Sequence, residues 1–477
     1  MPAPKGDLKA AIATTRFGLG ARPGEIEAAA HDPRGWLTAQ IRPSGAEIPQ
    51  TTGDAGSRLA ELREFQLARK DARQEKAQAA TEPAPQPVAD MQRDPVKMAQ
   101  KLLRDETGQD FLARARLGAT TQDSFTERWA LFWANHFTVS ATKLATATLM
   151  GPFEDEAIRP HVFGRFADLL AAADSHPAML LYLDQAQSVG PNSPLAQRAA
   201  FTPAAARRTG LNENLAREIL ELHTVGVNGG YSQADVTEFA RAMTGLSIAR
   251  PAEAQGGVSP TLFRAAAHEP GPRTILGVRY DEPGAAQATS VLRDLAAKPA
   301  TATFVCSKIA RHFVADTPDP ALVARLERAW TGSHGDLARV AEALVAAPQA
   351  WEPAAAKFKT PYEFIISSYR AADVSPTAIE KLVPILTALG QKPYSAPSPK
   401  GWPDTADAWV APDAIVKRMQ FAQAFAAVAT RDRDPSALAV EALGARLTPA
   451  VATAIARAES RPEGLALLLM SPEFQRR

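Results

Sequence analysis

The chain has 477 residues with 53 basic and 52 acidic side chains, and its formal net charge is +1 when histidine is neutral. A charge so close to zero gives no global field that would attract nucleic acid or an anionic membrane, so we expect no nucleic-acid partner. The single cysteine, Cys306, excludes an intramolecular disulfide, an all-cysteine zinc site and a cysteine-held iron–sulfur cluster.

The N-terminal residues show no targeting signal. Residues 1–20 contain neither a long uninterrupted apolar core nor a twin arginine, so we expect no signal peptide. No apolar run is long enough to cross a bilayer, and we expect no membrane span. These observations predict a cytoplasmic protein, while export together with a partner stays open.

The first part of the chain predicts a charged helix followed by a linker. Residues 57–78 have helical composition, whereas residues 72–95 combine Pro, Ala and charged side chains and are too polar to pack. We therefore expect an N-terminal helical segment at 1–71, an exposed linker or insertion at 72–95 and a main helical domain at 96–477. A sub-boundary within that domain is expected near residue 282.

Most of the remaining chain follows a helical pattern. In helix 123–137, Phe125, Trp129, Phe132 and His136 are spaced i, i+4, i+7 and i+11, which places them on one face. Ser232 and Asp235 resemble a capping box that opens a helix at 233–245. Further helices are expected at 152–173, 176–186, 211–225, 284–298, 300–315, 319–331, 334–347, 361–370, 412–430, 436–444, 448–457 and 462–470.

One segment departs from this pattern. Residues 260–280 hold Pro270, Gly271 and Pro272 between two short apolar runs, which predicts a small β-hairpin. The expected fold class is therefore mainly α, a multi-helical globular body with at most one small hairpin. Two tryptophans in the Pro-rich stretch 392–412 indicate a loop that packs down on the body.

Helix 211–225 carries the strongest candidate for a functional site. Glu218 and Glu221 are spaced i, i+3 at the border of an apolar stripe, where two carboxylates can bind a divalent metal or share a proton. His223 lies ~140° around an ideal helix from Glu218, so one metal cannot easily take both from this helix alone. The alternative is structural: the acids pair with arginines, and His223 caps the helix or packs in the core.

Two further histidines complete the candidate site. His136 ends an aromatic helix face, where a neutral imidazole can ligate a metal or accept a proton, although a hydrogen-bonded core histidine is the alternative. His268 lies in A-H-E-P-G at the predicted hairpin turn, and its alternative is an ordinary loop residue. With few histidines and no thiolates, such a site favours Mg, Mn, Fe or Zn. The candidate catalytic residues are Glu218, Glu221, His223 and His136, and the candidate metal ligands are these four together with His268.

Other kinds of site are excluded or have a structural explanation. The stretch 16–24 contains G-x-G, but its third glycine is misplaced and no strand precedes it, so no nucleotide cofactor is expected. No G-x-S-x-G elbow occurs, and Cys306 lies among apolar residues as a buried thiol would. Buried arginines in the amphipathic helices would need carboxylate partners and would compete with a metal for the same acids. These arginines are Arg217, Arg241, Arg311, Arg370 and Arg418, and their natural partners are Glu218, Glu221, Glu238 and Glu363.

Eight segments spread over nearly the whole chain resemble the bacterial family called "domain of unknown function 1800". This resemblance implies a helical protein without a settled activity, and it implies as partner a companion exported sulfatase-like protein. It supplies no catalytic residues. The segments are R-F-G at 16–18, R-W-A-L-F-W-A-N-H-F at 128–137, H-P-A-M-L-L-Y-L-D at 176–184, N-E-N-L-A-R-E-I-L-E-L-H-T-V-G at 212–226, A-H-E-P-G with L-G at 267–277, K-I-A-R-H-F-V at 308–314, P-Y-E-F at 361–364 and G-W-P at 401–403.

Two functions from different classes follow. The first is an enzyme or metal-binding protein with a site of histidines and glutamates. The second is a non-catalytic helical scaffold that supports the companion protein. The spatial arrangement separates them: a solvent-reachable pocket shared by His136, His223 and the two glutamates favours the first, and acids paired with arginines in a dry core favour the second.

Overall fold

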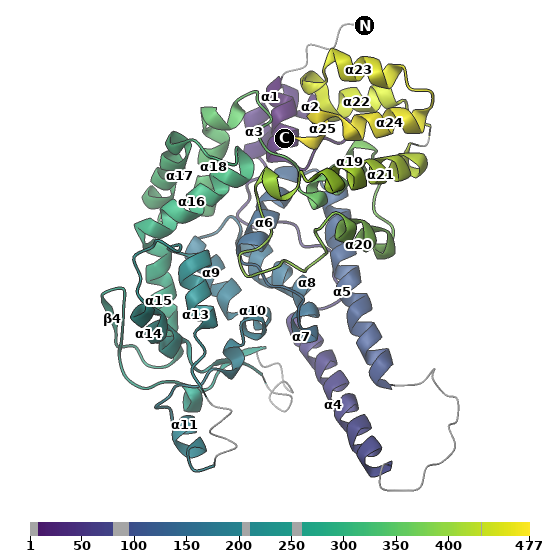
Figure 1. The fold of residues 1–477 in the computed structure, drawn as a ribbon. Helices are drawn as coiled ribbons and strands as arrows, with labels where there is room; N and C mark the ends of the chain where they lie inside the picture. The colour runs from purple at the N-terminus through teal and green to yellow at the C-terminus, as the bar shows by residue number, and fades with distance from the viewer. Residues whose placement is uncertain (1–7, 80–94, 203–209, 250–259, 431) are drawn as a thin grey trace.

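The computed structural model describes residues 8–79, 95–202, 210–249, 260–430 and 432–477. These residues are mainly helical, as the composition and periodicity predict (Figure 1). Within them, no helix combines the length and apolar character needed to cross a bilayer. The α-helices are α1 Leu8–Ile12, α2 Glu25–Ala30, α3 Pro33–Thr38, α4 Ala55–Ala79, α5 Pro95–Thr120, α6 Ser124–His136, α7 Leu144–Ala147, α8 Met150–Pro152, α9 Phe166–Ser175, α10 Pro177–Tyr182, α11 Pro194–Ala199, α13 Asn214–Glu218, α14 Gln233–Met243, α15 Ala285–Ala297, α16 Pro299–Phe313, α17 Pro320–Gly332, α18 Leu337–Ala346, α19 Pro361–Ala371, α20 Ile379–Ala388, α21 Pro412–Ala429, α22 Pro435–Leu443, α23 Pro449–Ala456, α24 Arg461–Met470 and α25 Pro472–Gln475.

Capping residues in the sequence mark the first residues of two of these helices, α14 and α19. Ser232 Oγ accepts a hydrogen bond from Asp235 N, and the Asp235 carboxylate accepts one from Ser232 N, so the predicted capping box of α14 is confirmed. Thr360 and Glu363 form the same arrangement at the start of α19, with Pro361 at its first position. Both ends are therefore set by local hydrogen bonds.

Three short segments of the described chain are π-helical rather than α-helical. They are Ala13–Phe17 after α1, Phe153–Ile158 after α8 and Ile219–His223 after α13. A π turn bonds residue i to i+5 and changes the angle between successive side chains. In the last of these segments, the turn determines where Glu221 and His223 point.

The β-structure consists of two small antiparallel sheets in the described residues. β3 (Arg273–Ile275) pairs with β4 (Val278–Tyr280), so a hairpin does lie in the second half of the predicted segment 260–280. The first half forms β2 (Thr261–Phe263), which pairs instead with β1 (Leu246–Ile248). The single expected hairpin is thus replaced by two pairs, because Pro270–Gly271–Pro272 separates β2 from β3.

Helix α6 lies at the centre of the main core. Phe125, Trp129, Phe132 and His136 are all buried, which confirms the predicted face. Trp129 packs its ring near those of Phe125 and Phe132, and its Nε1 donates to the Val162 carbonyl at 2.7 Å. Aromatic side chains of this size dominate the apolar area that stabilises a core.

Helices α4 and α5 pack side by side and project from the body (Figure 1). Leu62, Phe65 and Leu103 form a small separate core between them. α4 continues to Ala79, so the first residues of the predicted linker 72–95 are helical, and residues 80–94 lie outside the described part of the chain. The division at residues 71, 96 and 282 stays a prediction.

Candidate functional site

The structure brings two of the predicted site residues together in the core. The rings of His136 and His223 lie 6.2 Å apart, and both side chains are buried. His136 Nε2 donates to the His223 carbonyl at 3.1 Å, and Lys308 Nζ donates to His136 Nδ1 at 2.9 Å. Burial, and then the charge of Lys308, lower the pKa of His136 well below its usual value. His136 is therefore a neutral imidazole with both nitrogens occupied, which leaves none for a metal.

His223 is paired with an acid that the sequence did not suggest. Its Nδ1 lies 2.9 Å from Asp174 Oδ1, and both side chains are fully buried. Burial raises the pKa of Asp174, while the neighbouring imidazole lowers it. This enclosed pair agrees with the structural interpretation of His223 as a packed core residue.

Glu218 and Glu221 lie on a partly exposed face of the same segment. Glu221 is 3.7 Å from Arg217, a half-exposed pair one helical turn apart. Burial raises the pKa of Glu218, and Glu221 raises it further, while His223 and Arg217 lower it. The two acids thus neither share a pocket with the histidines nor lie fully buried against arginines, so the structure meets neither of the two expected arrangements.

His268 is held by its own loop. Its Nδ1 lies 2.9 Å from the Thr244 carbonyl at the end of α14, and its ring packs against Phe263 at 5.2 Å between centroids. Across the described residues, no three His, Cys, Asp or Glu side chains come together in a way that could hold a metal ion. The predicted divalent metal therefore has no centre in this part of the chain.

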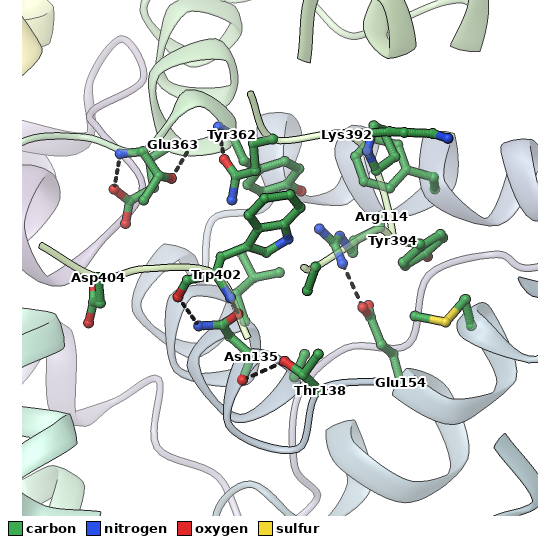
Figure 2. Close-up of a pocket in the computed structure, with 18 of the residues that line it drawn as sticks. Arg114, Asn135, Thr138, Glu154, Tyr362, Glu363, Lys392, Tyr394, Trp402 and Asp404 are labelled. Carbon is green, nitrogen blue, oxygen red and sulfur yellow. Dashed lines mark hydrogen bonds and ion pairs between the residues drawn. The ribbon is translucent and has the colours of Figure 1, made fainter. Parts of the chain in front are cut away.

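A pocket opens elsewhere, between α5, α6, the start of α19 and the loop 391–404 (Figure 2). Its volume is about 120 Å³, comparable to the ~150 Å³ of a cavity that can enclose a benzene molecule. Figure 2 shows Asp404 and Glu363 at one end and Arg114 at the other. Trp402 lies between the two ends. The pocket therefore offers acidic, basic and aromatic groups to one small molecule.

The acidic end contains a histidine–aspartate pair, here called the dyad. His312 Nδ1 donates to Asp404 Oδ2 at 3.1 Å. Because a carboxylate only accepts hydrogen bonds, this contact fixes the proton on Nδ1 and leaves Nε2 with its lone pair. Nε2 is buried and has no hydrogen-bond partner among the described residues. His312 lines the pocket, while its Nε2 is itself enclosed by protein atoms.

The charges around the dyad keep Asp404 ionised and His312 neutral. Burial raises the pKa of Asp404, but His312, Lys357 and Arg477 outweigh it and hold that pKa at about 2. Lys357 Nζ lies 3.6 Å and Arg477 Nη2 4.0 Å from Asp404 Oδ1. Burial lowers the pKa of His312, and Asp404 opposes this shift. The imidazole is therefore in its basic form near neutral pH.

A second buried acid supports the same end of the pocket. Glu363 accepts hydrogen bonds from Arg128 and lies 3.0 Å from Arg477 Nη2. Despite burial, these two guanidinium groups lower the pKa of Glu363 far below its usual range. Arg128 also donates to the Gly18 carbonyl at 2.8 Å, so the network joins α6 to the N-terminal part of the chain.

The other end is built around Arg114. Its guanidinium donates to Glu154 at 2.5 Å. Its Cζ lies 4.9 Å from the ring centroid of Phe111, 4.8 Å from Tyr362 and 5.3 Å from Tyr394. Burial raises the pKa of Tyr362 to about 12, so its hydroxyl stays protonated and can donate to a ligand.

The loop that carries Trp402 and Asp404 is fixed by one asparagine. Asn135 Oδ1 accepts from Trp402 N at 2.8 Å, and Asn135 Nδ2 donates to the Trp402 carbonyl at 3.1 Å. Gly401 has φ +86°, and a Cβ there would lie 2.5 Å from the Asn135 carbonyl. The predicted packing of this loop on the body is confirmed, since Trp409 is buried and donates to the Pro403 carbonyl.

The dyad escaped sequence reasoning because its members are 92 residues apart. A signal did exist, since His312 lies within K-I-A-R-H-F-V and Asp404 directly follows G-W-P. Tyr362 and Glu363 come from P-Y-E-F, and Asn135 comes from the aromatic helix. Four of the segments that carry the family resemblance thus converge on this one pocket.

Comparison with known proteins places the chain in a family but not in a reaction class. Residues 12–476 match the family described as "Protein of unknown function (DUF1800)". No curated protein and no solved structure matches the chain. Because the match covers nearly the whole sequence, the chain belongs to the DUF1800 family of proteins of unknown function.

Proposed function

We propose that this protein is an enzyme that binds a small molecule in the pocket and uses His312 as a general base. The observation that carries the proposal is the dyad on a pocket-lining histidine, in which Asp404 accepts from Nδ1–H and the enclosed Nε2 is left unprotonated and without a hydrogen-bond partner among the described residues. A carboxylate–imidazole pair with this geometry orients the base and stabilises the imidazolium that forms when it accepts a proton.

The groups around the dyad suit a proton transfer. His312 Nε2 removes a proton from a bound hydroxyl group or water, and the resulting positive charge is balanced by Asp404. The pocket-lining hydroxyls of Thr138 and Thr360 are already engaged in the local structure, Thr138 with the Asn135 carbonyl and Thr360 as the cap of α19. The attacking group is therefore a bound water or the substrate itself, rather than one of these side chains.

The other end of the pocket supplies binding and orientation. Tyr362 offers a hydroxyl, Trp402 offers an aromatic face, and Arg114 is already neutralised by Glu154. A cation that is already paired favours an uncharged polar substrate over a strongly anionic one. We therefore assign to the pocket a small, uncharged, partly apolar substrate with at least one hydroxyl or hydrolysable carbonyl group.

Kinetics with two matched variants test the proposal. The purified protein is assayed against chromogenic esters, amides and glycosides, and His312→Gln is compared with Glu218→Gln, which removes the acid favoured by sequence alone. Loss of a general base lowers kcat by about 10²–10⁴-fold, so His312→Gln should reduce kcat by this factor, whereas Glu218→Gln should keep the kcat of the wild type. The reverse result would move the site to α13, and equal activity of both variants would refute the role of His312.

Ligand binding and the protonation state of the dyad give a second test that does not need the right substrate. Histidine ¹⁵N chemical shifts should show His312 neutral at pH 7 with the proton on Nδ1, and fragments that bind the pocket should shift its Nε2 signal. A protonated His312, or a fragment screen in which no compound perturbs it, would contradict the proposal.

The role as a partner of an exported sulfatase-like protein rests on the family resemblance alone. It stays a proposal, as does the compartment of the protein. Co-purification of the two proteins tests the partnership, and failure to associate would remove it without bearing on the pocket.

A further inference from the structure

We propose that the outer half of the projecting helix pair binds an anionic lipid surface. This region, here called the distal arm, comprises residues 66–74 of α4 and 96–104 of α5, which project from the body in Figure 1. It excludes the segment between the two helices. The proposal is independent of the pocket and of the reaction.

Charge is concentrated on the distal arm. These 18 residues contain six basic side chains and one acidic one, a net charge of +5, whereas the whole chain carries +1. Lys101 is paired with Asp105 one turn away, which offsets part of this charge. All six basic side chains are exposed, and they are Arg69, Lys70, Arg73, Lys97, Lys101 and Arg104.

Apolar side chains are exposed among these charges. Leu67 is 47%, Met98 61% and Leu102 52% exposed. Met98 and Leu102 are spaced i, i+4 and share a face of α5. The small core between the two helices is formed by Leu62, Phe65 and Leu103. It does not include the three exposed side chains. Basic side chains interspersed with exposed apolar ones are the pattern by which helices attach to the headgroup region of anionic bilayers.

The chemistry of the distal arm favours lipid over the other polyanions and over self-association. A second copy would bring +5 against +5, and like charges repel. Single-stranded nucleic acid is held by aromatic side chains that stack on the bases, and the described residues of α4 and α5 expose no aromatic ring, since Phe65 and Phe111 are buried. Exposed Met and Leu side chains instead match the acyl boundary of a bilayer.

Vesicle co-sedimentation of the full chain tests the proposal. We expect binding to phosphatidylcholine vesicles that contain 30% phosphatidylglycerol and none to pure phosphatidylcholine vesicles. Each basic residue near such a surface strengthens binding about fivefold, so the triple variant Arg69→Gln, Arg73→Gln, Arg104→Gln should lose binding on the order of a hundredfold. Added salt should also weaken the binding of the wild type to the anionic vesicles, because salt screens charges.

A matched variant controls for total charge. Arg279→Gln, Arg339→Gln and Lys417→Gln remove the same charge from exposed positions on the body and should leave binding unchanged. A second arm variant, Met98→Gln with Leu102→Gln, should reduce the salt-resistant part of binding. Circular dichroism confirms that each variant is folded.

Three outcomes would overturn the proposal. Equal binding to neutral and anionic vesicles would remove the electrostatic role of the distal arm. An equal loss in the body variant would assign the effect to total charge. If the wild type bound heparin or an acidic protein but no vesicles, the ligand of the distal arm would be another polyanion and not a lipid surface.

Discussion

His136 and His312 differ in how many ring nitrogens the fold occupies. His136 uses both, one towards the His223 carbonyl and one towards Lys308. His312 uses only Nδ1, and its Nε2 has no partner among the described residues. A buried polar atom without a partner costs free energy. Nε2 of His223 is another such atom among the described residues, but of the two histidines only His312 lines the pocket, so only there could a small ligand in the pocket complete it.

Acid should destabilise the protein through Asp404. Its folded pKa of about 2 lies below its ordinary value of 3.8, so the folded state binds fewer protons than the unfolded state. Its contribution, roughly 2 kcal/mol, is complete above about pH 4 and is lost as the pH falls towards 2. Urea midpoints at pH 7, 4 and 2.5 should fall less steeply for Asp404→Asn than for the wild type. If the urea midpoint of both proteins fell equally with pH, the neighbours of Asp404 would not be lowering its pKa.

Replacement of Glu218 should cost little. Burial raises its pKa, so its charge opposes folding near pH 7, and Arg217, which lowers that pKa, is partly exposed and lies 3.1 Å from Glu213. Glu218→Gln should therefore change the free energy of unfolding by no more than about 1 kcal/mol, with stabilisation the favoured sign. Urea unfolding at pH 7 measures it. A loss of about 3 kcal/mol would instead reveal a buried ion pair at Glu218.

At the scale of elements, the loop 391–404 depends on its contact with the end of α6. Gly401→Ala should cost about 1–2 kcal/mol for the left-handed backbone and a further ~1–3 kcal/mol for overlap with the Asn135 carbonyl. Gly390 provides the control, because its φ is +87° and a Cβ there meets nothing within 4 Å. In urea unfolding, Gly401→Ala should have a much lower free energy of unfolding than Gly390→Ala. Equal losses would mean that the loop moves freely.

The helices could be predicted where their ends depend on neighbouring residues, and not where they depend on distant ones. The Ser232–Asp235 box and the proline at the start of α19 lie within a few residues of the helix that they begin. The helical wheel failed at 219–223, because a π turn breaks the α-helical spacing and lets His223 reach Asp174. Nothing in the local sequence indicates this turn. β1 was likewise not predicted, since its pairing partner β2 begins more than ten residues later in the chain.

At the scale of the whole molecule, the pocket is a product of tertiary structure. Arg114 comes from α5, Asn135 from α6, His312 from α16, Tyr362 from α19 and Asp404 from a loop. No spacing rule connects residues from five separate elements, so sequence reasoning placed the site where acids and histidines are close in sequence. The family segments contain Asn135, His312 and Tyr362 and end next to Asp404, because they mark residues without requiring them to be neighbours; Arg114 lies in none of them.

Buried ion pairs beside the pocket connect distant parts of the chain. Glu363 of α19 pairs with Arg128 of α6 and with Arg477. Glu363→Gln leaves the guanidinium groups of Arg128 and Arg477 without a full counter-charge, and breaking a buried pair costs about 3–5 kcal/mol. Asp373→Asn breaks the exposed pair with Arg22 and should cost less than about 1 kcal/mol. Asparagine tolerates the φ of +52° at that position, so the control isolates the charge. Urea midpoints should separate the two variants clearly, and equal midpoints would show that the Glu363 network does not hold these elements together.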